Sequence, residues 1–113
     1  MSTTVNDSAR TPRIVACLDL QGGRVVKGTE FVDLQDQGDP LALAARAEAT
    51  GADEVVLLDI AGTRGAERAA FLEVVRRAAR TLSVPVVVGG GVRSVEDAER
   101  ALDAGAVRVA VNS

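Results

Sequence analysis

The sequence has no histidine and only one cysteine, Cys17, among its 113 residues. One cysteine cannot form an internal disulfide, and no second thiol or imidazole is present to complete a cysteine-based zinc site. Nucleophile pairs of the Ser-His or Cys-His type are excluded for the same reason. Any acid–base chemistry must therefore use Asp, Glu or Lys, and we expect neither a metal nor a cofactor.

Basic residues are fewer than acidic ones, at 13 against 16, and long hydrophobic runs are absent from the sequence. The net charge is -3 and no basic stripe is present, which argues against nucleic acid as a partner. No apolar run approaches the ~18 residues of a membrane span. Residues 1–12, MSTTVNDSARTP, are polar and lack the apolar segment of a secretory signal, so we interpret them as a disordered leader. A cytoplasmic location is expected, since a lone thiol suits a reducing compartment.

Hydrophobic residues make up 47% of the chain, which is enough for the core of one small domain. Four apolar runs rich in β-branched residues predict strands buried on both faces, because the runs are near-continuous rather than alternating. These runs are Arg13–Leu18, Glu54–Leu58, Val84–Val88 and Arg108–Val111.

Helical patterns lie between the runs. Asp39 followed by Pro40 is typical of a helix start, Ser94 with Asp97 resembles a capping box, and a glycine stands where each of these two helices should end. The middle segment, AERAAFLEVVRRAARTL, predicts a helix with one apolar face. The members of that face are Phe71, Leu72, Val75, Ala78, Ala79 and Leu82.

The resulting order is β-α-β-α-β-α-β, which predicts right-handed crossovers and a parallel sheet. The joints from helix to strand repeat, as TGADEVV at 50–56 and AGAVRVAV at 104–111. Repeating βα units build both doubly wound sheets and (β/α)₈ barrels.

Each predicted strand ends on a polar side chain or on bare backbone. These ends are Asp19, Asp59, Gly89–Gly91, and Asn112 with Ser113. A single aspartate in such a place is more often a turn residue, but four polar ends at corresponding positions indicate a ligand-binding rim.

Three consecutive glycines in VPVVVGGGVRSVEDAERAL admit two explanations. One glycine could provide positive φ at a corner, or the backbone N–H groups could form a nest for a phosphate. The pattern is neither a Walker loop nor G-x-G-x-x-G. Glu96 and Asp97 occupy the first turn of the next helix and would repel an anion there, so a phosphate should be held by the glycines themselves.

A segment of about twenty residues, LQGGRVVKGTEFVDLQDQGDP, follows the first strand without a helical pattern. Connections of this length are typical of lids, binding loops or disorder. Gly22 and Gly23 suit a turn between two short extended runs. Lys27 is either a solvated surface lysine or a cation that reaches the site.

The strings RIVACLDLQGGRVVKGTEFVDLQDQGDP, DEVVLLDI and VVVGGGVRSVEDAERALDAGA, followed by VNS, closely resemble the cyclase subunit family of imidazole glycerol phosphate synthase. The resemblance runs from Arg13 to Ser113 and implies a (β/α)₈ TIM-barrel fold, of which these residues are the N-terminal half. The phosphoribosyl-formimino isomerase of the same pathway is the alternative relative, but CLDL with VVKG and DQGDP favours the cyclase.

The resemblance implies a lyase of histidine biosynthesis. Such enzymes use ammonia from a glutaminase partner to convert a bis-phosphate ribotide into imidazole glycerol phosphate and an aminoimidazole carboxamide ribotide. Asp19 matches one of two general acid–base carboxylates, and Lys27 matches the lysine of a mobile loop. Substrate-binding positions are matched by Asp59, Gly90, Gly91, Asn112 and Ser113.

The family's ammonia gate is matched by Arg13, Glu54 and Arg108, with Arg108 in place of a usual lysine. Two further positions depart from the family pattern. DIAGT at 59–63 replaces a DITAS-like run, and Val107 stands where an acidic residue commonly faces the glutaminase.

Only four of eight barrel strands are covered, so the second catalytic aspartate and second phosphate site are missing. Such a half-barrel should expose the first and last strand edges and an apolar inner face. Three interpretations follow: a partial cyclase inactive alone, a homodimer of half-barrels that rebuilds the barrel, or a phosphate-binding module without activity.

Overall fold

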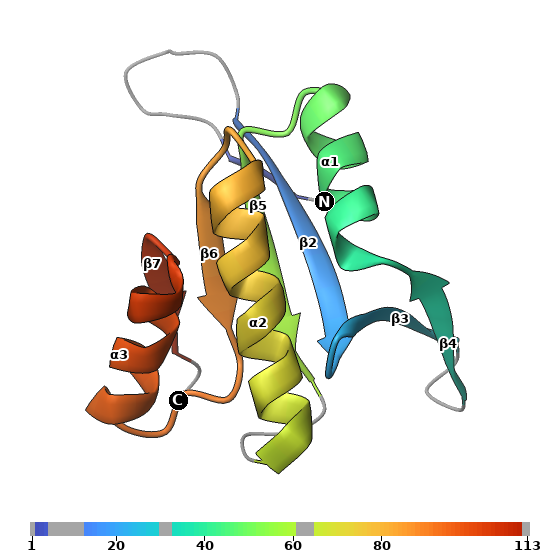
Figure 1. The fold of residues 1–113 in the computed structure, drawn as a ribbon. Coiled ribbons are helices and arrows are strands. Elements are labelled where there is room, and N and C mark those ends of the chain that lie inside the picture. The colour runs from blue at the N-terminus through green and yellow to red at the C-terminus, as the bar shows by residue number, and fades with distance from the viewer. Residues whose placement is uncertain (1, 5–12, 30–32, 61–64, 112–113) are drawn as a thin grey trace.

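A computed structural model describes residues 2–4, 13–29, 33–60 and 65–111, which form a mixed sheet and three helices (Figure 1). The strand order is β4-β3-β2-β5-β6-β7, and β1 pairs with β2. The strands are β1 (Ser2–Thr4), β2 (Arg13–Gln21), β3 (Arg24–Thr29), β4 (Asp33–Gly38), β5 (Glu54–Asp59), β6 (Val86–Gly89) and β7 (Arg108–Ala110). The helices are α1 (Pro40–Ala49), α2 (Gly65–Thr81) and α3 (Val95–Ala104).

The four predicted strands are confirmed as the parallel part of this sheet. β5 is parallel to both β2 and β6, and β6 is parallel to β7. Each is joined to the next through a segment that contains a helix, so the predicted β-α-β-α-β-α-β order is confirmed. β2 continues past Leu18 to Gln21, and β6 begins two residues later than predicted, at Val86.

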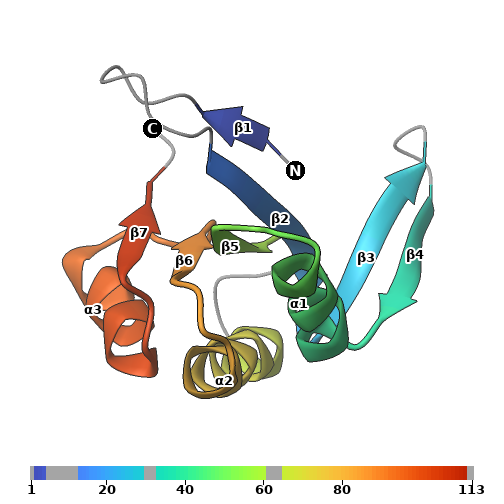
Figure 2. The ribbon, with the colours of Figure 1, turned by 90° about the horizontal axis from the view of Figure 1, so that it is seen from above.

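All three helices lie on one side of the sheet (Figure 2). Asp39 caps α1 through a hydrogen bond from the Ala42 amide, and Ser94 caps α3 through one from the Asp97 amide, as their sequence positions predict. α2 buries Phe71, Val75 and Ala78 of its predicted apolar face. The expected members Leu72, Ala79 and Leu82 are only partly buried, whereas Val74 and Arg68 are buried as well.

The other face of the parallel strands corresponds to the inside of a barrel wall. Cys17, Asp19 and Ala110 are exposed on it, and the exposed Ile60 and Val111 follow the ends of β5 and β7. Four parallel strands with helices on one side and an open inner face are the arrangement of half a (β/α)₈ barrel, as expected.

The segment after β2 folds as an antiparallel ribbon. Gly22 and Gly23 form the two-residue turn between β2 and β3, and Gly22 has φ 62°, which suits the turn. β3 then pairs with β4 along its length, so the predicted turn is confirmed while the second hairpin is new. The β2 edge, expected to be open, pairs with β3 at Leu20 and Gln21.

The amino-terminal end differs from the expected disordered leader at Ser2–Thr4. These residues form β1, which pairs antiparallel with Arg13–Val15 of β2. The rest of the predicted leader lies outside the described residues. Within the described ranges, no helix has the length and hydropathy needed to cross a membrane.

Candidate functional site

The three glycines after β6 form a corner that has no room for side chains. Gly90 has φ 80° and Gly91 has φ 70°, values that L-residues rarely adopt. A Cβ atom on Gly90 would overlap the Asp59 carbonyl oxygen, and one on Gly91 would lie 2.6 Å from Nη1 of Arg68. On Gly89 it would lie 2.5 Å from the Leu58 side chain. The corner therefore needs glycine for both backbone conformation and close packing.

The corner also leaves backbone donors unused. Among the described residues, the amides of Gly90, Gly91 and Val92 donate no hydrogen bond. Successive free backbone N–H groups in a turn can form an anion-binding nest. Gly89 and Gly90 line a cavity of about 320 Å³ at this end of the sheet, together with Leu58, Ile60 and Ala110. The local geometry therefore suits a phosphate held by the loop.

The first turn of α3, in contrast, already has acceptors of its own. The Arg93 amide donates to Oδ2 of Asp97 at 3.0 Å, and the Asp97 amide donates to the Ser94 hydroxyl at 3.1 Å. The Arg93 amide is the main reason that the pKa of Asp97 lies below its ordinary 3.8, and the Arg100 guanidinium lowers it further. A carboxylate at this position makes the helix start unsuitable for a phosphate.

We expect the Asp97 carboxyl to titrate below 3.8 in the folded protein. Because the folded-state pKa is lowered, the stabilisation it gives to α3 is fully present above pH 3.8 and is lost as pH falls through the lowered pKa. Carbon-detected NMR titration of the side-chain carboxyl measures this directly. An Asp97 carboxyl that titrates at or above 3.8 would contradict the capping role.

The two strand-end aspartates lie on opposite faces of the sheet. Asp19 is in register with Leu58, whereas Asp59 is in register with Leu20, which is fully buried beneath the helices. Asp59 accordingly directs its carboxylate to the helix side, where Arg68 binds it at 2.9 Å. The expected substrate role of Asp59 remains a prediction, and one of its observed contacts is this buried ion pair.

Asp19 is exposed on the inner face near the same end of the sheet. Asp19, Leu58 and Gly89 form one row across β2, β5 and β6, because Asp19 is in register with Leu58 and Leu58 is in register with Gly89. The register therefore brings Asp19 and the glycine corner to one rim. Lys27 lies in β3 in register with Gln35 of β4, and Asn112 and Ser113 lie outside the described residues.

The three residues matched to an ammonia gate lie at the other ends of the strands. Arg108 forms an ion pair with Glu54, which reaches from β7 to β5 across the intervening β6. Arg13 begins β2 and is exposed. Val107, immediately before β7, is 53% exposed at this end. Glu54 and Arg108 are thus joined directly, at the end of the sheet opposite the glycine corner.

Sequence reasoning missed Arg68, which lies behind the glycine corner. The signal was present, because Arg68 precedes Phe71 and Val75 by three and seven residues and so shares their helical face. An arginine on a buried face predicts a carboxylate partner nearby. The described residues contain no group of three Asp, Glu or Cys side chains suited to a metal ion.

Comparison with known proteins gives a consistent result. A family model described as "Histidine biosynthesis protein" matches residues 13–113. The imidazole glycerol phosphate synthase subunit HisF of Acidobacterium capsulatum is 54% identical over 103 residues, 91% of this chain and 40% of that protein. The HisF subunits of Myxococcus xanthus (55% over 103 residues) and Sulfurisphaera tokodaii (54% over 101) are similar over 91% and 89% of this chain. In both cases the chain covers 40% of the relative.

Proposed function

Because the chain belongs to the histidine biosynthesis protein family, we propose that it carries the N-terminal half of an ammonia-dependent cyclase site. The reaction closes the imidazole ring of phosphoribulosyl-formimino-aminoimidazole carboxamide ribotide with ammonia. Its products are imidazole glycerol phosphate and aminoimidazole carboxamide ribotide. The observation that carries the proposal is the row of three amides at 90–92 that donate to no described residue, on the rim that also bears Asp19.

Each group at the rim has a role that its chemistry supports. The amides of Gly90 and Gly91 bind one phosphate of the substrate, with Asn112 and Ser113 of the next strand end as further ligands. Asp19 transfers protons during ammonia attack and ring closure, as a carboxylate exposed on the inner face can do. Lys27, which lies in β3, is the further catalytic residue that the family resemblance implies.

The chain spans about two fifths of the length of the curated relatives that it matches. The second acid–base carboxylate and the second phosphate site therefore belong to strands that the sequence does not include. We propose that the cyclase site is complete only when those strands close the barrel against β2 and β7.

A glutaminase is the proposed source of ammonia. The ammonia enters at the opposite end of the sheet, where Arg13, Glu54 and Arg108 begin their strands. The Glu54–Arg108 ion pair joins two of these strand starts and supports a gating role. Val107 has an exposed apolar side chain there, so the proposed glutaminase contact at this position involves no carboxylate of this chain. We place the reaction in the cytoplasm.

A second copy of the chain is the alternative to the missing strands. The exposed Ile60 and Val111 at the ends of β5 and β7 favour a partner that covers the inner face. Such a homodimer would place two Asp19 carboxylates at one mouth. Sedimentation over a range of concentrations distinguishes a compact dimer from a monomer. The third possibility is a phosphate-binding module without turnover, which predicts that a monomer binds phosphate.

The phosphate cradle can be tested on the chain alone with inorganic phosphate. We expect saturable shifts of the Gly90, Gly91 and Val92 amide signals in ¹⁵N-labelled protein at constant ionic strength. Gly51 provides an internal control, because its amide already donates to the Glu48 carbonyl. Shifts confined to other parts of the chain, or none at all, would contradict the cradle.

A further inference from the structure

Arg68 is a buried cation on a helix that otherwise packs through apolar groups. Its side chain is 9% exposed, and its guanidinium lies 5.0 Å from the centre of the Phe71 ring. Nη1 binds Oδ2 of Asp59 at 2.9 Å, and the Asp59 side chain is fully buried. The carboxylate and the aromatic ring together restrict the orientation of the guanidinium.

The same guanidinium contacts the glycine corner from behind. Nη1 lies 3.5 Å from the Gly90 carbonyl oxygen. It also occupies the space that a side chain at Gly91 would need, since a Cβ there would lie 2.6 Å from Nη1 and 3.1 Å from Cζ. Arg68 therefore touches both glycines whose amides are unoccupied.

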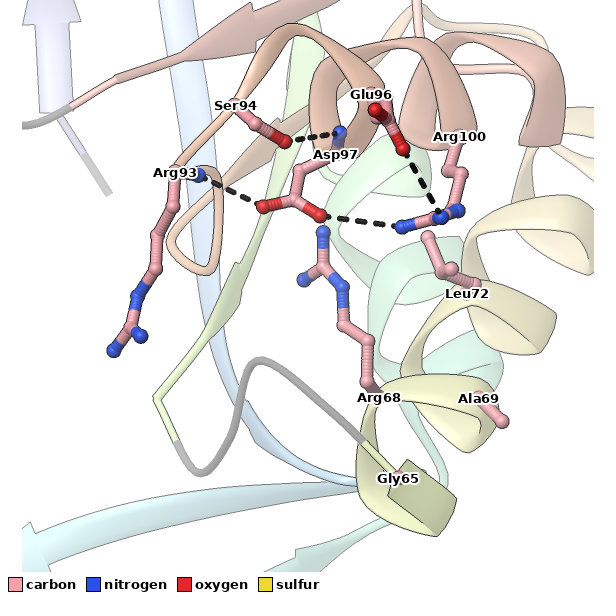
Figure 3. A pocket seen from close by; sticks show the side chains of 9 residues that line it. All are labelled: Gly65, Arg68, Ala69, Leu72, Arg93, Ser94, Glu96, Asp97 and Arg100. Atoms are coloured by element: carbon pink, nitrogen blue, oxygen red, sulfur yellow. Dashed lines mark hydrogen bonds and ion pairs between the residues drawn. The ribbon is translucent and has the colours of Figure 1, made fainter.

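The second terminal nitrogen of the guanidinium has no acceptor among the described residues. Nη2 of Arg68 is buried and forms no hydrogen bond with any described residue. Figure 3 shows the guanidinium directed toward the first turn of α3, where Asp97 binds the Arg93 amide and Arg100 but is not joined to Arg68. Asp59 thus satisfies only part of the hydrogen-bonding capacity of the guanidinium, which lies next to the glycine corner.

We propose that Arg68 is a positioning residue for the phosphate cradle. It holds Gly90 and Gly91 in the conformation that leaves their amides free, through its contacts behind them. This inference rests on the proposed function, because it concerns the phosphate site of the cyclase half. It differs from a role as a fold-stabilising ion pair only, which would leave the phosphate affinity of folded protein unchanged when Arg68 is replaced.

The test compares the affinity for inorganic phosphate in folded samples of the wild type, Arg68→Met and Arg68→Lys. The amide signals of Gly90 and Gly91 report binding, and circular dichroism reports the folded fraction. Arg76→Met is the matched control, because Arg76 lies on the same helix, is exposed and pairs only with Glu73 among the described residues.

We expect Arg68→Met to weaken phosphate binding by about tenfold or more, the effect of losing a charge-assisted contact. Arg68→Lys restores part of the affinity, since it keeps the charge but not the fork, and Arg76→Met leaves the affinity unchanged. Before phosphate is added, the Gly90 and Gly91 signals should already differ between Arg68→Met and the wild type. If Arg68→Met does not fold, the test rests on Arg68→Lys, which we expect to bind inorganic phosphate less tightly than the wild type.

Two results would overturn the inference in different ways. Folded Arg68→Met or Arg68→Lys that binds phosphate as tightly as the wild type removes the positioning role and leaves the cradle intact. A wild-type chain whose glycine amides do not respond to phosphate removes the cradle itself, and the role of Arg68 with it.

Discussion

Replacement of Gly90 by alanine should lower the free energy of unfolding by about 2–5 kcal/mol, the combined cost of a strained φ and of overpacking. Gly90 has φ 80°, and a Cβ on it would overlap the Asp59 carbonyl oxygen and approach the Asp59 nitrogen to 3.2 Å. Both of these are backbone atoms, which cannot move aside as the end of a flexible side chain can. Urea denaturation followed by circular dichroism measures the loss, since the chain has no Trp or Tyr for fluorescence.

Gly51 provides the matched control for this substitution. It also has positive φ, 109°, but a Cβ there would meet nothing within 4 Å. Gly51→Ala should therefore cost only the conformational part, about 1–2 kcal/mol. Equal losses for Gly90→Ala and Gly51→Ala would show that close packing against Asp59 does not restrict the corner.

Replacement of Asp59 by leucine should cost about 3–5 kcal/mol, because it leaves the Arg68 cation buried without its partner. The carboxylate is fully buried, Arg68 is nearly so, and the pair joins the end of β5 to the start of α2. Removal of both charges in Asp59→Leu with Arg68→Met should recover most of the loss, since two apolar side chains of similar size can pack in their place. Urea denaturation of the wild type, the two single variants and the double variant gives a double-mutant cycle for the ion pair.

The exposed pair of Arg76 and Glu73 is the control for the cycle. Its atoms are as close, at 2.8 Å, but both side chains are about half exposed. Glu73→Ala should therefore cost at most about 0.5 kcal/mol. A loss for Asp59→Leu no larger than that of Glu73→Ala would show that the buried pair contributes little to the link between β5 and α2.

Much of the fold follows from burial patterns that are visible in the sequence. A strand covered on both sides within a barrel needs apolar residues on both faces, so the runs VVLL at 55–58 and VVV at 86–88 identify β5 and β6 without any knowledge of the tertiary structure. Helix starts at Asp39 and Ser94 are equally local, because each side chain caps a nearby amide.

In β4 there is no such pattern. Asp33–Gly38 is DLQDQG, which contains one apolar residue and no alternation. It is held by backbone pairing with β3, whose register shifts between Val25 and Val26. A strand that pairs through its backbone and carries a single apolar residue leaves little trace in hydrophobic periodicity.

The candidate site was predictable in composition but not in orientation. Asp19 and Asp59 look equivalent, since each follows an apolar run. Side chains alternate between faces along a strand, so the register that places Leu20 beside Asp59 sends the two carboxylates to opposite sides. A difference of one residue in register is enough for this, and register depends on the whole sheet.

The most direct measurement is turnover by this chain mixed with a polypeptide that holds the remaining strands of the Myxococcus xanthus relative. The ribotide substrate is supplied with an excess of ammonium salt, which replaces the glutaminase. If the chain carries half of a cyclase site, the mixture forms imidazole glycerol phosphate, neither half does so alone, and Asp19→Asn abolishes the activity. A folded complex of the two halves that shows no turnover, or one in which Asp19→Asn is fully active, would contradict the proposed function.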